Sequence, residues 1–316
     1  MSWRATVSAL LCVALLAGHG AASARTPDDR ANDHEFAIIG HSFAHGGGQS
    51  RLEEALAASA DPGLAFVVAT GIKSASEPCS DALYAQRRDL FDDARRPVIV
   101  APAASDWSDC KNSGGRPIAL ERLNRLRELF YPETTSLGRR KLALARLSSS
   151  AKFRSYAEHA QWTVGTVLYA TINLPSNNNH YLSEAGRNSE FEDRAVANRF
   201  WLTRLFALAR RKGLDALVLF SEGDVKLPAE PASLLQRLSR GNSSGPRDGY
   251  AQTRQQIQAL AEKFEGKVLL VDTAAPKDAE PAITWRDRLG HVSVGSTTVH
   301  VQVTPGAEPM FTLSRP

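Results

Sequence analysis

The chain has 316 residues, of which 43% are hydrophobic and 23% charged, with 22 glycines and 16 prolines. These values are those of an ordinary globular protein, and they exclude a collagen-like, coiled-coil or disordered chain. The formal net charge is only +4, and the basic residues are spread along the chain. Nucleic acid is therefore not an expected partner.

The first 24 residues have the pattern of a secretory signal peptide. Arg4 precedes the apolar and small residues Ala5–Gly18, and Ala22-Ser23-Ala24 is typical of a cleavage site. An uncleaved membrane anchor is the alternative, but a spanning helix needs about 20 apolar residues and this run is shorter. We expect residues 25–316 to form a single exported domain, periplasmic or secreted, with no membrane span.

Export determines how the cysteines are interpreted. Cys12 leaves with the signal peptide, so Cys79 and Cys110 remain as a pair in an oxidising compartment. The sequence predicts one disulfide between them. Two free buried thiols are the alternative.

Short apolar runs along the exported chain predict strands that are buried on both faces. These runs are Phe36–Ile39, Leu64–Val68, Pro97–Val100, Val167–Ile172, Ala216–Phe220 and Val268–Val271. From about Ile283 the pattern changes to alternation, most plainly in Val299–Thr304, which predicts a terminal antiparallel strand or hairpin.

Helical patterns lie between these runs, at Ser50–Ala60, Asp81–Arg95, Leu120–Phe130 and Glu190–Lys212. Ser50 and Glu53 have the spacing of a capping box at the start of the first helix. The order of elements predicts an α/β protein with mixed sheets rather than a barrel of eight regular units. In such folds ligands bind outside the carboxyl ends of the strands.

The segments that follow the predicted strands carry a recognisable succession of motifs. They are Gly71-Ile72-Lys73-Ser74, Pro78-Cys79-Ser80-Asp81, Trp107-Ser108-Asp109-Cys110, Leu120-Glu121-Arg122-Leu123, Ser136-Leu137-Gly138, Gln161-Trp162, Asn177-Asn178-Asn179 and Trp201-Leu202. Over roughly residues 35–275 this succession resembles a bacterial exported branch of the calcineurin-like metallophosphoesterases. The resemblance implies a four-layer αββα sandwich of two mixed β-sheets, in which acidic and nitrogen ligands hold two metal ions over a phosphate ester.

Most of the ligand positions implied by the resemblance hold other residues. Gly40-His41 stands where the pattern has Gly-Asp, the bridging Asp is missing from Gly71-Ile72-Lys73, and Ser105 replaces the ligand Asn. Asp272-Thr273-Ala274 stands where the pattern carries histidines. His41, Asp106 and Asp272 are the remaining candidate metal ligands, and they follow different strands.

A scaffold that keeps its structural motifs while its ligand positions change predicts a pseudoenzyme. We expect a non-catalytic protein with no cofactor, which binds a small-molecule or protein ligand at the ancestral active-site face. The residues expected to line that face are Ser42, Ser105, Asn177, Asn178 and His180.

Two enzymatic alternatives stay open at this point. A metal-dependent phosphoesterase could hold a single Zn²⁺ or Mn²⁺ in a rebuilt site of His41, Asp106 and Asp272, with His45 nearby. A serine hydrolase could use Ser42, because Gly40-His41-Ser42-Phe43-Ala44 is similar to a nucleophile elbow and follows a strand.

Overall fold

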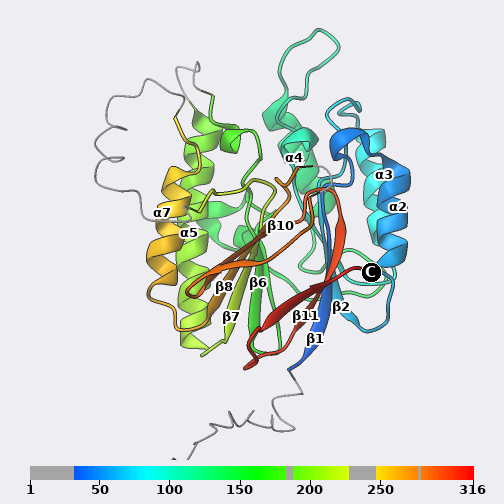
Figure 1. Cartoon of the computed structure of the whole chain (residues 1–316). Helices are drawn as coiled ribbons and strands as arrows, with labels where there is room; N and C mark the ends of the chain where they lie inside the picture. The colour runs from blue at the N-terminus through cyan, green and yellow to red at the C-terminus, as the bar shows by residue number, and fades with distance from the viewer. Residues whose placement is uncertain (1–31, 183–187, 228–246, 277–278) are drawn as a thin grey trace, which may run out of the picture.

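The computed structural model describes residues 32–182, 188–227, 247–276 and 279–316 (Figure 1). The predicted signal peptide lies outside the described residues. Strands alternate with helices along much of the chain and the last five elements are all strands, so the α/β class is confirmed. The helices are α2 (Gln49–Ala58), α3 (Asp81–Asp92), α4 (Ala119–Phe130), α5 (Ser189–Arg211) and α7 (Ala251–Ala261).

The smaller of the two sheets has five strands in the order β12-β11-β1-β2-β3. Its strands are β1 (His34–Ile39), β2 (Leu64–Thr70), β3 (Val98–Ala101), β11 (Thr298–Val303) and β12 (Phe311–Ser314). The first three are parallel, and β11 pairs antiparallel with both β1 and β12. The predicted terminal antiparallel strand is therefore confirmed.

The larger sheet has seven strands in the order β4-β5-β6-β7-β8-β10-β9. Its strands are β4 (Ala145–Arg146), β5 (Ala160–Val164), β6 (Val167–Thr171), β7 (Ala216–Phe220), β8 (Lys267–Asp272), β9 (Thr284–Arg286) and β10 (Leu289–Ser293). Strands β6, β7, β8 and β10 are parallel, while β4, β5 and β9 pair antiparallel with their neighbours. Both sheets are therefore mixed.

Three hydrophobic clusters show that the layers follow the order helix, sheet, sheet, helix. One cluster fills the space between the sheets, a second joins the larger sheet to α5 and α7, and a third joins the smaller sheet to α2, α3 and α4. Figure 1 shows α5 and α7 on one side of the paired sheets, with α2 and α3 on the other. Because each sheet is covered on both faces, the sequences of its buried strands are nearly continuous apolar runs.

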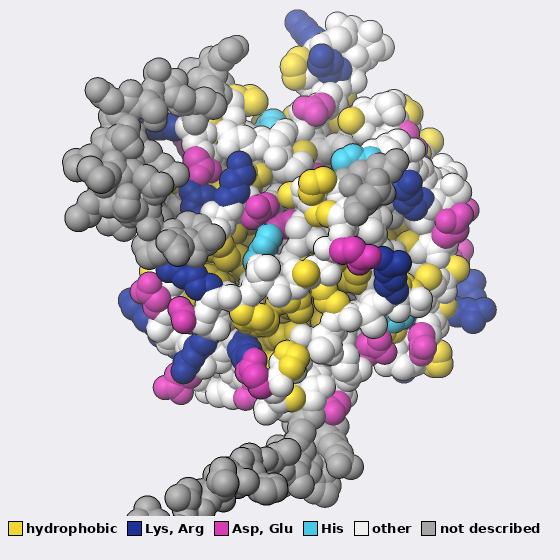
Figure 2. Space-filling view, in the orientation of Figure 1, with side chains coloured by type: hydrophobic (Ala, Val, Ile, Leu, Met, Phe, Trp, Pro, Cys, Tyr) yellow, Lys and Arg dark blue, Asp and Glu magenta, His cyan; other side chains and the backbone are white. Residues whose placement is uncertain are grey.

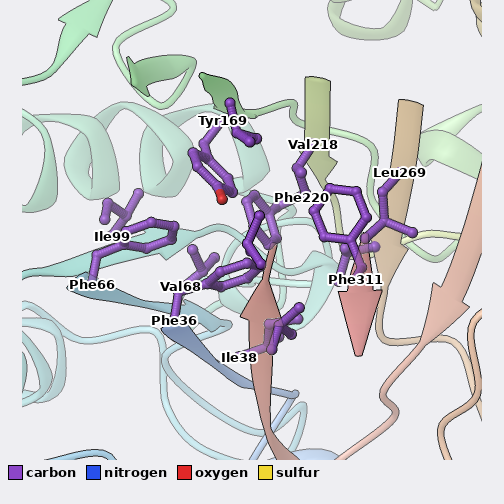
Figure 3. Close-up of a cluster of buried hydrophobic side chains, with 14 of the residues drawn as sticks. Phe36, Ile38, Phe66, Val68, Ile99, Tyr169, Val218, Phe220, Leu269 and Phe311 are labelled. Carbon is purple, nitrogen blue, oxygen red and sulfur yellow. The ribbon is translucent and has the colours of Figure 1, made fainter. Parts of the chain in front are cut away.

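Aromatic rings from both sheets meet in the central cluster (Figure 3). Phe36 of β1 stacks on Phe66 of β2, with ring centroids 4.9 Å apart. Phe66 in turn meets the edge of Tyr169 of β6, at 4.8 Å. These contacts join the two sheets directly, and they fix how the loops at the carboxyl ends of the strands face one another.

The predicted capping box at Ser50 and Glu53 is wrong. Helix α2 begins one residue earlier than predicted, with Gly48 as its N-cap and no side-chain cap. Ser50 therefore lies inside the first turn, and Glu53 accepts a hydrogen bond from Gln49 at 2.7 Å. In helix α3 the cap is Ser80, whose hydroxyl accepts from the N–H of Leu83.

The predicted disulfide between Cys79 and Cys110 is confirmed, with the two Cα atoms 5.8 Å apart. It ties the loop after β2 to the loop after β3. Within the described residues, no helix combines the length and the apolar character needed to cross a membrane.

Candidate functional site

The carboxyl ends of the two sheets meet at one buried carboxylate, that of Glu222 in the loop after β7. Glu222 accepts the N–H of Ala104, which follows β3 in the other sheet, at 2.6 Å. It also accepts the N–H and the hydroxyl of Ser176, at 2.8 and 2.9 Å. Burial raises the pKa of Glu222 to about 7. Loops from both sheets thus converge where an α/β fold places its ligands.

Asp106, one of the predicted metal ligands, is fully buried and faces the protein backbone. One carboxylate oxygen accepts the N–H groups of Ile72 and Lys73, at 2.9 and 3.3 Å. The other accepts the N–H of Ala103 at 2.7 Å. Burial raises the pKa of Asp106 to about 6. The two oxygens thus connect the loops after β2 and β3, so the role of this carboxylate is structural.

The side chain of Lys73 is buried beside Asp106, with only 1% of its surface exposed. Its ammonium donates to the backbone carbonyls of Ser74 and Ser105, at 2.7 and 2.8 Å. Burial lowers the pKa of Lys73, and the nearby Asp106 carboxylate opposes that shift. A fixed positive charge therefore lies among the loops after β2 and β3.

His41 forms a hydrogen bond with Ser105, with 3.0 Å between Nε2 and Oγ. The Ser105 hydroxyl also donates to the carbonyl of Lys73 at 2.9 Å. A hydroxyl has a single hydrogen and a carbonyl only accepts, so His41 must donate from Nε2 to the hydroxyl. Burial lowers the pKa of His41 to about 4, so the ring is neutral near pH 7. In this arrangement the imidazole cannot act as a base toward Ser105.

Ser42, the nucleophile of the serine-hydrolase alternative, is buried with 2% of its surface exposed. Its neighbour His41 is hydrogen-bonded to Ser105, and His45 is exposed on the next turn. In the described part of the chain, none of the side-chain hydrogen bonds of histidines reaches Ser42. The geometry of a serine–histidine pair is thus absent at this position.

A second group of polar side chains lies near the ends of β7 and β8 and within β10. Asp272 is the last residue of β8, Asp224 follows β7, and His291 lies in β10. Ligand atoms of these three residues lie within 4.8 Å of one another, and they form the one such group found among the described residues. His291 Nε2 is 2.6 Å from Asp272 Oδ2 and 3.7 Å from Asp224 Oδ1.

Further contacts orient this Asp224–Asp272–His291 triad. Oδ1 of Asp272 accepts from the Ser293 hydroxyl and, at 2.9 Å, from the N–H of Ala274. The hydrogen bond with Asp272 raises the pKa of His291. The Asp272 side chain is 3% exposed, whereas those of Asp224 and His291 are 32% and 27% exposed. Figure 2 shows acidic and histidine side chains next to one another near the middle of the viewed face.

The structure divides the three metal ligands that the sequence predicts. Asp272 joins the triad, while His41 and Asp106 are hydrogen-bonded among the loops after β1, β2 and β3. Sequence reasoning missed Asp224 and His291. Asp224 follows a predicted strand and so carried a positional signal. His291 did not, because its place depends on β10 pairing in parallel with β8.

The asparagine segment after β6 makes turns within the chain. Asn177 donates to the Ser108 hydroxyl at 3.0 Å, and its side-chain oxygen accepts the N–H of His180 at 3.2 Å. Asn178 donates to the carbonyl of Arg247 at 2.9 Å. The ring of His180 packs edge-on against Trp107, at 4.7 Å. These contacts connect the asparagine segment to neighbouring loops. Asn178 and His180 have left-handed backbone conformations, as is typical of turns.

Neither a protein-family model nor a curated protein matches the sequence.

Proposed function

We propose that this chain is an exported, non-catalytic member of the metallophosphoesterase fold, which binds a ligand through the loops at the carboxyl ends of its strands. The observation that carries the proposal is the state of two buried charges, those of Lys73 and Asp106. Backbone N–H groups bind the Asp106 carboxylate, and backbone carbonyls bind the Lys73 ammonium. The four-layer arrangement of two mixed sheets and the motif succession support the choice of family.

The residues in the loops after β1, β2 and β3 do not fit a two-metal site. Such a site needs carboxylate and nitrogen atoms that are free to face two cations about 4 Å apart. Here both Asp106 oxygens face N–H groups, and Nε2 of His41 donates to Ser105. The ammonium of Lys73 adds a positive charge at the same place, which opposes the binding of cations.

Hydrolysis of model phosphate esters tests the proposal. The purified exported chain is assayed with 4-nitrophenyl phosphate and bis(4-nitrophenyl) phosphate, with Mn²⁺, Zn²⁺ or Mg²⁺ added in turn. We expect no metal-dependent release of nitrophenol above the rate in buffer. A metal-dependent rate that falls in a His41→Gln variant would reject the non-catalytic function.

A metal-dependent phosphoesterase is the second candidate, favoured by the triad alone. The same assay separates it from the first, because His291→Gln would remove its activity while His41→Gln would not.

Export has its own support and its own test. The disulfide between Cys79 and Cys110 supports it, because such bonds persist in oxidising compartments. Cell fractionation of a strain that expresses the chain with its native leader measures it. We expect the mature chain outside the cytoplasm with both cysteines oxidised, and a chain that stays in the cytoplasm with its leader intact would reject export.

A further inference from the structure

We propose that the Asp224–Asp272–His291 triad is a binding site for one divalent cation of the zinc class. The site shares Asp272 with the ligand set that the resemblance implies, but Asp224 and His291 are not members of that set, and His291 comes from β10. The inference concerns binding and holds whether or not the protein catalyses a reaction.

The donor set and its spacing suit such a cation. One imidazole nitrogen and two carboxylate oxygens are typical ligands of Zn²⁺, which binds them at about 2.0 to 2.2 Å. Ligand atoms around a tetrahedral zinc ion then lie about 3.3 Å apart. His291 Nε2 lies 2.6 Å from Asp272 and 3.7 Å from Asp224, on either side of that value. Binding of the ion requires the hydrogen bond between His291 and Asp272 to open and the three ligand atoms, which lie within 4.8 Å of one another, to turn toward one point.

The balance of charge also points to a cation. Asp272 is buried, and a buried carboxylate is costly unless a cation accompanies it. Among the described residues, no lysine or arginine forms an ion pair with Asp224 or Asp272, and His291 is their shared partner. With a neutral imidazole the group carries two negative charges, which one divalent ion neutralises.

The surroundings of Asp272 are those of an oriented ligand. Ser293 and the N–H of Ala274 both bind its Oδ1, which leaves Oδ2 directed at His291. Such outer contacts fix the direction of a metal-binding carboxylate. Asp224 and His291 are partly exposed, so solvent and small ligands can reach the three side chains. An anionic oxygen ligand, such as a carboxylate or a phosphate, could therefore complete the coordination of a bound ion.

Zinc binding by the purified exported chain tests the site directly. Protein without an affinity tag is stripped with a chelator and titrated with Zn²⁺ against a chromophoric competitor. We expect one ion per chain, with affinity at least tenfold lower in both His291→Gln and Asp224→Asn. His41→Gln and His45→Gln are the matched controls, and their affinity should equal that of the wild type.

Three results would overturn the site: no zinc bound by the wild type, unchanged affinity in His291→Gln, or a loss in His41→Gln that equals the loss in His291→Gln. Circular dichroism of each stripped variant shows whether it is folded. Because His291 and Asp224 are partly exposed, these two variants keep the test valid even where Asp272→Asn does not fold. Zinc binding without ester hydrolysis supports both proposals, while hydrolysis that requires His291 rejects the proposed function alone.

Discussion

Two groups of polar residues lie at the carboxyl ends of the strands, and they differ in what their charges face. The first, here called the inner network, consists of His41, Lys73, Ser105, Asp106 and Glu222. Its charges face backbone N–H and C=O groups of the chain itself. In the triad, Asp224 and Asp272 each accept one backbone N–H, from Lys226 and Ala274. They differ from the inner network in that both also lie near one partly exposed imidazole, that of His291.

We infer from this difference that the polar residues at the carboxyl ends of the strands are divided between stability and binding. Groups saturated by backbone partners are already satisfied, and a ligand gains little by displacing those partners. Asp224 and His291 of the triad are partly exposed to solvent, so we expect the triad to retain the capacity to bind. We therefore expect substitutions in the inner network to change stability, and substitutions in the triad to change binding.

The largest effect is expected for Asp106→Ala. The N–H groups of Ile72, Lys73 and Ala103 would lose their acceptor in a buried place, and Lys73 would lose its nearby negative charge. We expect the free energy of unfolding to fall by about 4 kcal/mol, since each unpaired group costs roughly 1 to 3. Urea denaturation measures it. Asp106→Asn, which keeps the volume and one carbonyl oxygen, should lose less, and equal losses in both variants would contradict this account.

The pH dependence of stability comes next. The pKa of His41 falls from 6.5 to about 4 in the folded protein, so the fold favours the neutral ring. Its contribution is complete above pH 6.5 and is lost as the pH falls toward 4, by about 2 to 3 kcal/mol. Asp106 and Glu222 act in the opposite sense, because their raised pKa values favour the fold at low pH.

The contribution of His41 is therefore measured as a difference between two proteins. Urea denaturation of the wild type and of His41→Gln at pH 7.5 and pH 4.5 separates it from the carboxylates, which both proteins share. We expect the stability gap between them to shrink or reverse at the lower pH. A gap that stays constant across this range would show that His41 does not titrate as described.

A smaller effect is expected at Gly71, which packs against the ring of His41. Its φ is +74°, and an added Cβ would lie 3.0 Å from Cε1 of His41 and 3.1 Å from the Cβ of Ala103. We expect Gly71→Ala to lower the free energy of unfolding by about 2 kcal/mol. Gly46→Ala is the matched control, because its φ is +78° but its Cβ would meet nothing within 4 Å. Urea denaturation measures both variants. Equal losses of unfolding free energy in Gly71→Ala and Gly46→Ala would mean that the contact with His41 does not contribute to the cost.

The same division explains what the sequence could predict. Strands β1, β2 and β7 belong to sheets that are covered on both faces, so their residues are almost all apolar. These apolar runs were sufficient to predict the strands from the sequence. The disulfide prediction followed from the two cysteines, Cys79 and Cys110, that lie outside the predicted signal peptide. The triad depends on β10 pairing with β8 across 16 intervening residues, from Asp272 to Leu289. The hydrogen-bond partners of Asp106 are backbone N–H groups. Every residue type except proline carries such a group, so the sequence alone does not show which of them bind this carboxylate.

The smallest effect on stability is expected for Asp224→Asn in metal-free protein. Its side chain is 32% exposed, and its 3.7 Å distance to His291 is long for an ion pair that stabilises a fold. We expect a change in the free energy of unfolding below about 0.5 kcal/mol. With Zn²⁺ added, the wild type should gain thermal stability because the ion binds only the folded chain, and Asp224→Asn should gain less. Thermal melts with and without zinc measure both quantities. A large loss in the metal-free variant would place Asp224 with the inner network and end the distinction between the two groups.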